Sequence, residues 1–231
     1  MRTFSNFDIL EMWERGRALH PLDRGLLVLS TALSSSTEDL ADRPLGRRNR
    51  ALFDLHCISF GSRLRGWTSC TACREKVEFD LDANALTTVE APEEVFLVEG
   101  ERFRVPTSRD LAEVMAANHG AAAAIRLIER CAISASGAGA WSERMMEEVE
   151  EKMASADPMA EIRLRLDCPT CGHEWDESLD IASFVWAEIE ARARRLLWEI
   201  HSLASAYGWT EADTLSVPAA RRAMYLEMVG A

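Results

Sequence analysis

Two short stretches of the chain decide its fold: WTSCTACREKVEFDLD, residues 67–82, and DCPTCGHEWDESLD, residues 167–180. Each contains a pair of cysteines three positions apart: Cys70 with Cys73, and Cys168 with Cys171. Two cysteines at this spacing in a tight turn aim both sulfur atoms at one point. Two such turns supply the four thiolates of a tetrahedral zinc site. The sequence therefore predicts a Zn²⁺ ion bound by these cysteines.

The segments beside the cysteine pairs favour a zinc ribbon. Residues 75–82, 161–167 and 173–180 alternate between apolar and polar side chains, as half-buried strands do. The two pairs are separated by residues 74–167, and we interpret residues 83–160 as an insertion into the ribbon. Metal binding would hold the two ends of this insertion together and stabilise a long loop closure.

Other interpretations of these cysteines remain open: a redox pair, vestigial pairs, or two separate turns. A thioredoxin-like site needs a CxxC at a helix start after a strand, and neither pair has that context. A catalytic zinc ion needs an open coordination position, and four cysteines leave none, so we expect a structural ion. His173 is an alternative ligand, although we expect it on the ribbon surface. Cys57 and Cys131 lie in apolar helical contexts typical of buried small side chains.

The remaining chain predicts a mainly helical α+β fold. We expect a helical N-terminal part over residues 1–62 and a helical C-terminal part over residues 181–231. These parts flank the split ribbon, formed by residues 63–82 and 161–180. The 83–160 insertion carries a β-hairpin and helices.

Three helices are predicted in the N-terminal part. Ser5 with Asp8 resembles a capping box, Pro21 suits the first turn of a second helix, and residues 34–37 form a loop. A third helix follows Pro44 and stops at Gly61. Its first turn is crowded by Arg47, Arg48 and Arg50, where the helix dipole disfavours positive charge. We interpret these arginines as a solvated helix end, with a surface for an acidic partner as the alternative.

The insertion and the C-terminal part also carry local signals. Residues 94–106 predict a hairpin with Glu99-Gly100 at its turn, and residues 134–140 predict a break. Helices are predicted over 109–118, 121–133 and 142–156. In the C-terminal part, an apolar stripe predicts one long helix that ends at Gly208. The members of the stripe are Val185, Ile189, Ala193, Leu196, Ile200, Leu203 and Tyr207. Thr210 with Asp213, and then Pro218, begin two further helices.

Composition excludes several classes of protein. The 231 residues are 48% hydrophobic, which is too apolar for a disordered chain. A net charge of −12 argues against a general nucleic-acid binder. The chain has no apolar run long enough for a membrane span, and its first residues lack the apolar core of a secretory signal. We therefore expect an intracellular, soluble protein. No Walker, Rossmann, GxSxG or HExxH signature is present, which favours a non-enzymatic role.

The order of the segments resembles a known family. Three stretches carry the resemblance: residues 13–32 with 44–81; the strand and turn FRVPTSRDLAEV at 103–114; and LLWEIHSLASAYGWTEADTLSVPAARRAMYLEMV at 196–229. They resemble the zinc-ribbon relatives of the phage T4 small baseplate hub protein, also called the baseplate hub assembly chaperone family. This family occurs in contractile phage tails and in phage-like contractile injection systems. The first CxxC departs from the second, because it lacks the proline and the trailing glycine.

The resemblance implies a non-enzymatic component of the baseplate hub, or a factor that assembles it. It implies other hub or wedge proteins as partners, no small-molecule substrate, and a location in the cytoplasm during assembly or in the finished baseplate. We assign partner contacts to Trp209, Arg221, Arg222 and Tyr225. The alternative is a zinc-ribbon regulator that binds nucleic acid through Arg63–Trp67 and Arg163–Arg165. An enzyme with carboxylate acid–base chemistry is a third hypothesis that no residue spacing supports.

Overall fold

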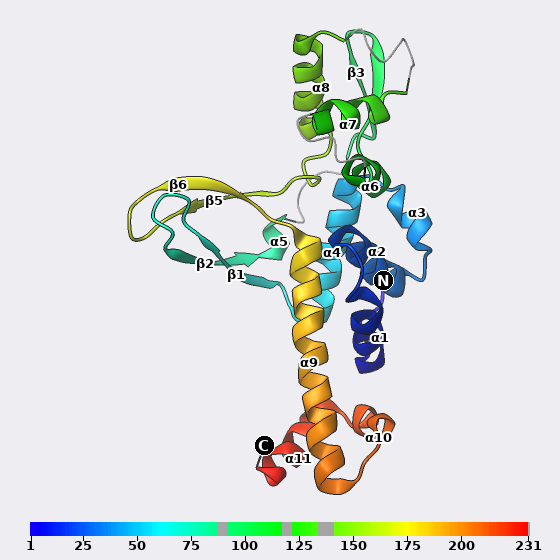
Figure 1. The fold of residues 1–231 in the computed structure, drawn as a ribbon, viewed down its shortest axis with the longest axis vertical. Helices are drawn as coiled ribbons and strands as arrows, with labels where there is room; N and C mark the ends of the chain where they lie inside the picture. The colour runs from blue at the N-terminus through cyan, green and yellow to red at the C-terminus, as the bar shows by residue number, and fades with distance from the viewer. Residues whose placement is uncertain (87–91, 117–121, 134–140, 231) are drawn as a thin grey trace.

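The computed structural model describes residues 1–86, 92–116, 122–133 and 141–230. These residues form the mainly helical α+β structure that the sequence predicts (Figure 1). The helices are α1 (Asn6–Gly16), α2 (Pro21–Leu33), α3 (Thr37–Ala41), α4 (Leu45–Phe60), α5 (Ala83–Leu86), α6 (Ser108–Ala116), α7 (Ala123–Cys131), α8 (Glu143–Ala156), α9 (Ile181–Tyr207), α10 (Glu211–Ser216) and α11 (Ala219–Val229). The strands are β1 (Arg63–Ser69), β2 (Lys76–Asp82), β3 (Val95–Val98), β4 (Glu101–Arg104), β5 (Arg163–Asp167) and β6 (Glu174–Ser178).

Helix α9 is the central helix of the molecule, against which the N-terminal and C-terminal helices pack. Its 27 residues follow Asp180, whose carboxylate caps the helix, and end before Gly208, which has a left-handed φ of 69°. Figure 1 shows α1, α2 and α4 along one half of α9, and α10 and α11 at its far end. The predicted stripe is buried at Val185, Ile189, Ala193, Leu196 and Leu203. The prediction is wrong at Tyr207, which is 43% exposed at the end of the helix, and holds only in part at Ile200, which is half-buried. Burial of Val185, Ile189, Ala193 and Leu196 against the N-terminal helices forms part of the main hydrophobic core.

Two antiparallel hairpins project from the same side of this helical body (Figure 1). One hairpin is β1–β2, whose register places Ser69 opposite Lys76. The other is β5–β6, with Asp167 opposite Glu174. Each of these pairs closes the ladder immediately before a CxxC turn. The hairpin register therefore places the two cysteine pairs at the far ends of the hairpins.

The segment between the hairpins contains a third hairpin, β3–β4, at one end of the molecule (Figure 1). Its turn is Glu99-Gly100 as predicted, and both residues have positive φ, 47° and 87°. The hairpin packs on α7 and α8 through a second hydrophobic cluster that includes Phe96, Phe103, Ile128 and Val149. Helices α6, α7 and α8 cover most of the predicted helical ranges. Residues 117–121 and the predicted break at 134–140 lie outside the described residues.

Local signals correctly predict the starts of α1, α2 and α10. The capping boxes of Ser5 with Asp8 and of Thr210 with Asp213 are both formed. Pro21 stands at the first position of α2. The prediction of three N-terminal helices is wrong, because Ser36 caps the additional helix α3. This helix has five residues, too few to show an apolar periodicity.

Helix α4 begins with hydrogen-bond partners that are distant in the sequence. Pro44 offers no side-chain cap. Instead the Leu45 N–H donates to the carbonyl of Pro106 at 3.0 Å, and the Gly46 N–H donates to Asp157 Oδ2 at 2.7 Å. These contacts satisfy N–H groups that a helix start leaves without partners. They also attach the segment between the hairpins to the first turn of α4.

The same attachment corrects the interpretation of the arginine-rich helix start. Arg47 is exposed, but Arg48 is only 8% exposed, so a solvated helix end is wrong for Arg48. Its guanidinium donates to Asn49 Oδ1 and to Ser108 Oγ. Ser108 begins α6, which therefore covers this turn of α4. Within the residues that the structure describes, no helix is both long enough and apolar enough to cross a membrane.

Candidate metal centre

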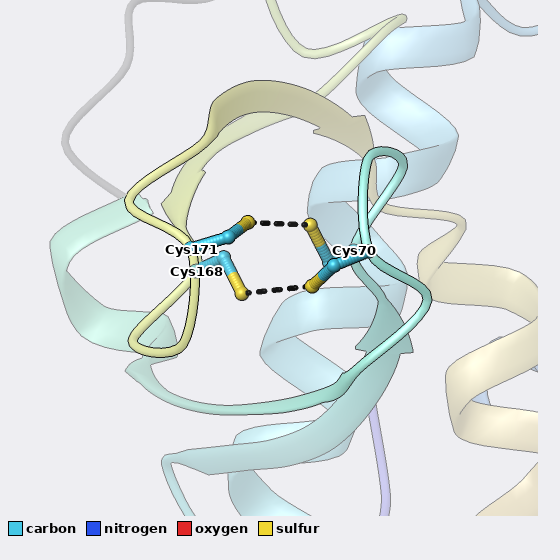
Figure 2. A group of neighbouring side chains, drawn as sticks. Cys70, Cys168 and Cys171 are labelled. Atoms are coloured by element: carbon cyan, nitrogen blue, oxygen red, sulfur yellow. Dashed lines mark hydrogen bonds between the residues drawn. The ribbon is translucent and has the colours of Figure 1, made fainter.

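Four cysteine sulfur atoms, two from each long hairpin, meet within 4.8 Å of one another. Across the two hairpins, Cys70 Sγ lies 3.7 Å from Cys171 Sγ, and Cys73 Sγ lies 3.6 Å from Cys168 Sγ. Figure 2 shows these sulfur atoms facing one another between the two turns. Both distances exceed the S–S bond length of about 2.05 Å, so the thiols are free. The structure thus brings together all four predicted cysteines.

The two turns share one backbone geometry although their sequences differ. The residue after the second cysteine takes the left-handed conformation in both, with φ of 66° at Arg74 and 70° at Gly172. Its N–H donates to the carbonyl of the first cysteine, at 3.0 Å for Arg74 to Cys70 and at 2.8 Å for Gly172 to Cys168. The missing glycine of the first turn therefore changes the strain at Arg74 but not the course of the backbone.

A second hydrogen bond closes each turn. The Cys70 N–H donates to the carbonyl of Glu75 at 2.8 Å, and the Cys168 N–H donates to that of His173 at 2.9 Å. Because both turns close in the same way, each presents its two sulfur atoms toward the other hairpin. The side chains of Cys70 and Cys168 are buried, whereas Cys73 and Cys171 are exposed.

The electrostatics of the cluster favour one thiolate when no cation is bound. The N–H groups of Cys73 and Ala72 lower the pKa of the Cys70 thiol to about 6. At Cys73 the N–H of Glu75 lowers the pKa, but contacts with the other thiols together with burial outweigh it and raise the pKa to about 12. Neighbouring thiols cannot all ionise because their charges repel. A bound cation compensates that charge, and coordinating thiols are deprotonated outright. The donor set therefore fits a metal ion.

Further contacts join the two hairpins beside the cysteines. Thr68 Oγ1 donates to Glu177 Oε2 at 3.1 Å. His173 Nε2 and Thr71 Oγ1 share a hydrogen bond of 2.9 Å, and the His173 ring stacks on Trp175 with an angle of 7° between the ring planes. His173 is exposed and lies on the hairpin surface, as we expected.

The remaining cysteines lie away from the cluster. Cys131 is fully buried, and burial raises the pKa of its thiol to about 12. Cys57 is half-buried, and burial likewise raises its pKa. The prediction of a buried small side chain is confirmed for Cys131 and holds only in part for Cys57.

The C-terminal residues assigned to partner contacts divide into two kinds. Trp209 and Tyr225 pack edge to face with ring centres 4.9 Å apart, and Arg221 is exposed. Arg222 is only 3% exposed, and its guanidinium donates to Glu199 Oε2 at 2.7 Å. The Arg222 side chain therefore holds α11 against α9 and offers no surface to a partner while this packing is kept.

The arginines of strands β1 and β5 are paired with acidic side chains. Arg63 and Arg65 contact Asp80 at 2.7 and 3.3 Å. On the other hairpin, Arg163 contacts Glu161 at 3.0 Å and Arg165 contacts Glu174 at 2.6 Å. A nucleic-acid surface needs cations that can neutralise phosphates. These ion pairs, with the net charge of −12, disfavour the nucleic-acid hypothesis.

One buried charged network was not predicted from the sequence. Asp110 is 1% exposed and accepts hydrogen bonds from Arg104, Arg130 and the N–H of Thr107. Burial by itself would raise the pKa of Asp110, but the bonds from Arg104 and Thr107 outweigh it and lower the pKa to about 2. Thr107 and Asp110 have the same spacing as the capping pair Ser5 and Asp8. The hydrogen bonds between Thr107 and Asp110 could therefore have been predicted from the sequence. The two arginines come from other elements, and no local pattern indicates them.

Comparisons of this chain with protein-family models, with curated proteins and with solved structures find no match. A function must therefore be inferred from the four-cysteine cluster, from the surfaces around it and from the resemblance described above.

Proposed function

We propose that Cys70, Cys73, Cys168 and Cys171 hold a structural zinc ion. The observation that carries this proposal is the spacing of their sulfur atoms. A tetrahedral site with Zn–S bonds of about 2.3 Å has S···S edges of ~3.8 Å. The two distances across the hairpins, 3.7 and 3.6 Å, agree with such an edge. Four thiolates fill the coordination sphere, so the ion would supply cross-linking and no catalytic water.

The position of the cluster determines what such a cross-link does. Hairpin β1–β2 precedes the 83–160 segment and hairpin β5–β6 follows it. A cross-link between their turns fixes both ends of the segment on one side of α9. The segment would then present its hairpin and helices at a constant angle to the helical body. Such a fixed arrangement of the segment and the helical body suits a scaffold protein, which holds interaction surfaces in place.

We further propose that this scaffold is non-enzymatic and acts in building the baseplate hub of a contractile tail or injection system. The resemblance over residues 13–32, 44–81, 103–114 and 196–229 supports this role. The C-terminal surface supports it too, because Met224 and Met228 are 58% and 70% exposed beside the Trp209–Tyr225 pair. Exposed methionine and aromatic side chains are enriched in protein–protein interfaces.

The experiment is recovery of a tagged copy from its native host, with contractile particles separated from soluble complexes by sedimentation and analysed by quantitative mass spectrometry. Recovery in particles at fixed stoichiometry identifies a hub component. Recovery only in soluble complexes with hub or wedge proteins identifies an assembly factor. Copurification with no tail protein contradicts the proposed role.

A matched pair of variants tests the C-terminal surface in the same assay. We expect Arg221→Ala to reduce recovery of tail proteins, because Arg221 is exposed and lies one helical turn before Tyr225 on α11. Arg194→Ala is the control, because Arg194 is an exposed arginine on α9 that pairs with Glu190. Equal recovery with both variants removes Arg221 from the contact surface. A salt-dependent shift of DNA or RNA by the wild-type protein would favour the regulator instead.

A further inference from the structure

A pocket of about 400 Å³ lies where α6 meets the starts of α2, α4 and α9. Leu111 and Met115 of α6 contribute apolar side chains to its wall, and Ile162 and Leu179 contribute others. Its polar lining includes Arg48 and Asn49 of α4. None of the four clustered cysteines lines this pocket, so it is separate from the proposed metal centre.

Arg48 brings a buried positive charge to this pocket. Its guanidinium makes three hydrogen bonds, and all of them go to the neutral side chains of Asn49 and Ser108. A guanidinium has five N–H donors and stays charged in proteins, so donors remain for a further acceptor. None of its hydrogen bonds goes to a carboxylate of the described residues, and the carboxylate whose charge acts on it is that of Asp180.

The contrast with Arg222 shows why this arrangement is unusual. Arg48 and Arg222 are the buried arginines of the described ranges, at 8% and 3% exposure. Arg222 pairs with Glu199 at 2.7 Å, whereas Arg48 has no such partner. Buried charges in proteins are normally paired, because removing an ion from water is costly. Arg48 therefore lacks a directly bonded anion, and the Asp180 carboxylate compensates its charge only from beyond ion-pair distance.

The surroundings of Arg48 indicate which anion would fit. The N-terminus of α2, with 13 residues, lines the pocket and favours negative charge, whereas that of α9 is already capped by the Asp180 carboxylate. The exposed carboxylates of Glu161 and Asp180 also line it, and these would repel a second negative charge. A single negative charge is thus favoured over a phosphate dianion. The apolar wall favours an anion that is carried on an apolar group.

We propose that this pocket binds one carboxylate on an apolar stem, with Arg48 as its ion-pair partner. The planar fork of the guanidinium matches the two oxygen atoms of a carboxylate. Two sources share this chemistry: the C-terminal residue of a partner polypeptide, and a free carboxylic acid. Because α6 forms one wall and α2, α4 and α9 form the others, the bound group would also join the 83–160 segment to the helical body.

The test is NMR titration of the full-length zinc-loaded protein labelled with ¹⁵N-arginine. The probes are sodium hexanoate, neutral hexanamide and inorganic phosphate. We expect hexanoate to shift the Arg48 Nε–H resonance, which is assigned by its loss in Arg48→Lys, and to saturate. Hexanamide and phosphate are expected to leave it unchanged. Wild-type protein that binds no hexanoate, or that responds equally to hexanamide, overturns the proposal.

Variants separate the ion pair from general apolar binding. Arg48→Gln should weaken hexanoate binding at least about tenfold, because a charge-assisted hydrogen bond is lost. Arg48→Lys keeps the charge but not the fork, and it should bind with intermediate affinity. Arg47→Gln, on the same turn but exposed, should bind as the wild type does. Retained binding in a folded Arg48→Gln protein contradicts the proposal.

A tripeptide pair identifies the source of the carboxylate. Acetyl-Ala-Leu-Leu with a free C-terminus is compared with its C-terminal amide. Tighter binding of the free-acid peptide than of hexanoate supports a polypeptide C-terminus, and the reverse order supports a small carboxylic acid. Equal binding of the acid and amide peptides contradicts an ion pair with Arg48.

Discussion

Arg74 stands at a position where the backbone favours glycine. Its φ of 66° matches the 70° of Gly172 at the equivalent place in the other turn. A side chain with a Cβ atom is strained by about 1–2 kcal/mol in this conformation. The turn tolerates the strain because hydrogen bonds from Arg74 to Cys70 and from Cys70 to Glu75 fix its course. The first turn is therefore formed but stores strain that the second avoids.

Replacing Arg74 with glycine should stabilise the protein. We expect Arg74→Gly to raise the free energy of unfolding by about 1 kcal/mol, because the left-handed strain is relieved. Gly172→Ala introduces the strain in the second turn and should lower it by a similar amount. Urea unfolding of the metal-loaded proteins measures both. A less stable Arg74→Gly protein would contradict the equivalence of the turns.

Gly46 is needed for a different reason, the close approach of Asp157. A Cβ atom added at Gly46 would lie 1.7 Å from Asp157 Oδ1. We expect Gly46→Ala to lower the free energy of unfolding by roughly 2 kcal/mol or more, because the carboxylate must move from the α4 start. Asp157→Ala removes the obstacle, so the double variant should lose less than the sum of the two single losses. Additive losses in a double-mutant cycle would argue against the contact.

At the scale of elements, the sequence predicts what is locally encoded. The capping pairs at Ser5 and Thr210, the turn at Glu99-Gly100 and the end of α9 at Gly208 all agree with the structure. These signals lie within a few residues of the feature that they specify. The strand β1 before the first cysteine pair carries a weaker pattern, because Gly66 interrupts its alternation.

The features that the sequence does not predict depend on contacts between residues far apart in the chain. Arg48 is buried because Ser108 and the segment near Asp157 cover the start of α4, which no local pattern can indicate. The four cysteines could be grouped from their spacing alone, because two equal CxxC turns imply a common ligand. The partners of Arg222 and Asp110 could not be identified from the sequence, because each ion pair joins separate elements.

The Asp110 network makes stability depend on pH in the acid range. The pKa of Asp110 is about 2 in the folded protein, below its ordinary value of 3.8. The unfolded chain therefore binds the proton first, so the stabilisation is complete above pH ~4 and is lost as the pH falls toward 2. The shift corresponds to roughly 2 kcal/mol.

We expect Asp110→Asn to lower stability at pH 7 by about 2 kcal/mol or more and to flatten this acid dependence, because Arg104 and Arg130 lose their buried partner. Asp42→Asn is the control, since Asp42 pairs with Arg109 at an exposed site and should change stability much less than Asp110→Asn does. Urea unfolding between pH 7 and pH 3 measures both. An unchanged pH dependence in Asp110→Asn would contradict the assignment.

At the scale of the whole molecule, the four-cysteine cluster brings together the two hairpins that precede and follow the 83–160 segment. Residues 74–167 lie between the two cysteine pairs. Cross-linking a loop of roughly 100 residues stabilises a folded chain by about 4–5 kcal/mol in the chain-entropy model. Loss of a metal cross-link should therefore loosen the two hairpins, while the contacts of Leu45 with Pro106 and of Gly46 with Asp157 still hold the 83–160 segment on α4.

The most direct test is metal analysis of the purified full-length protein, combined with X-ray absorption at the zinc edge. We predict one zinc ion per chain with four sulfur ligands at about 2.3 Å. Cys168→Ser should lose the ion and melt at a lower temperature, whereas Cys57→Ser should keep both the metal content and the melting temperature. Metal-free wild-type protein whose melting temperature is the same with zinc and with chelator would contradict the four-thiolate centre.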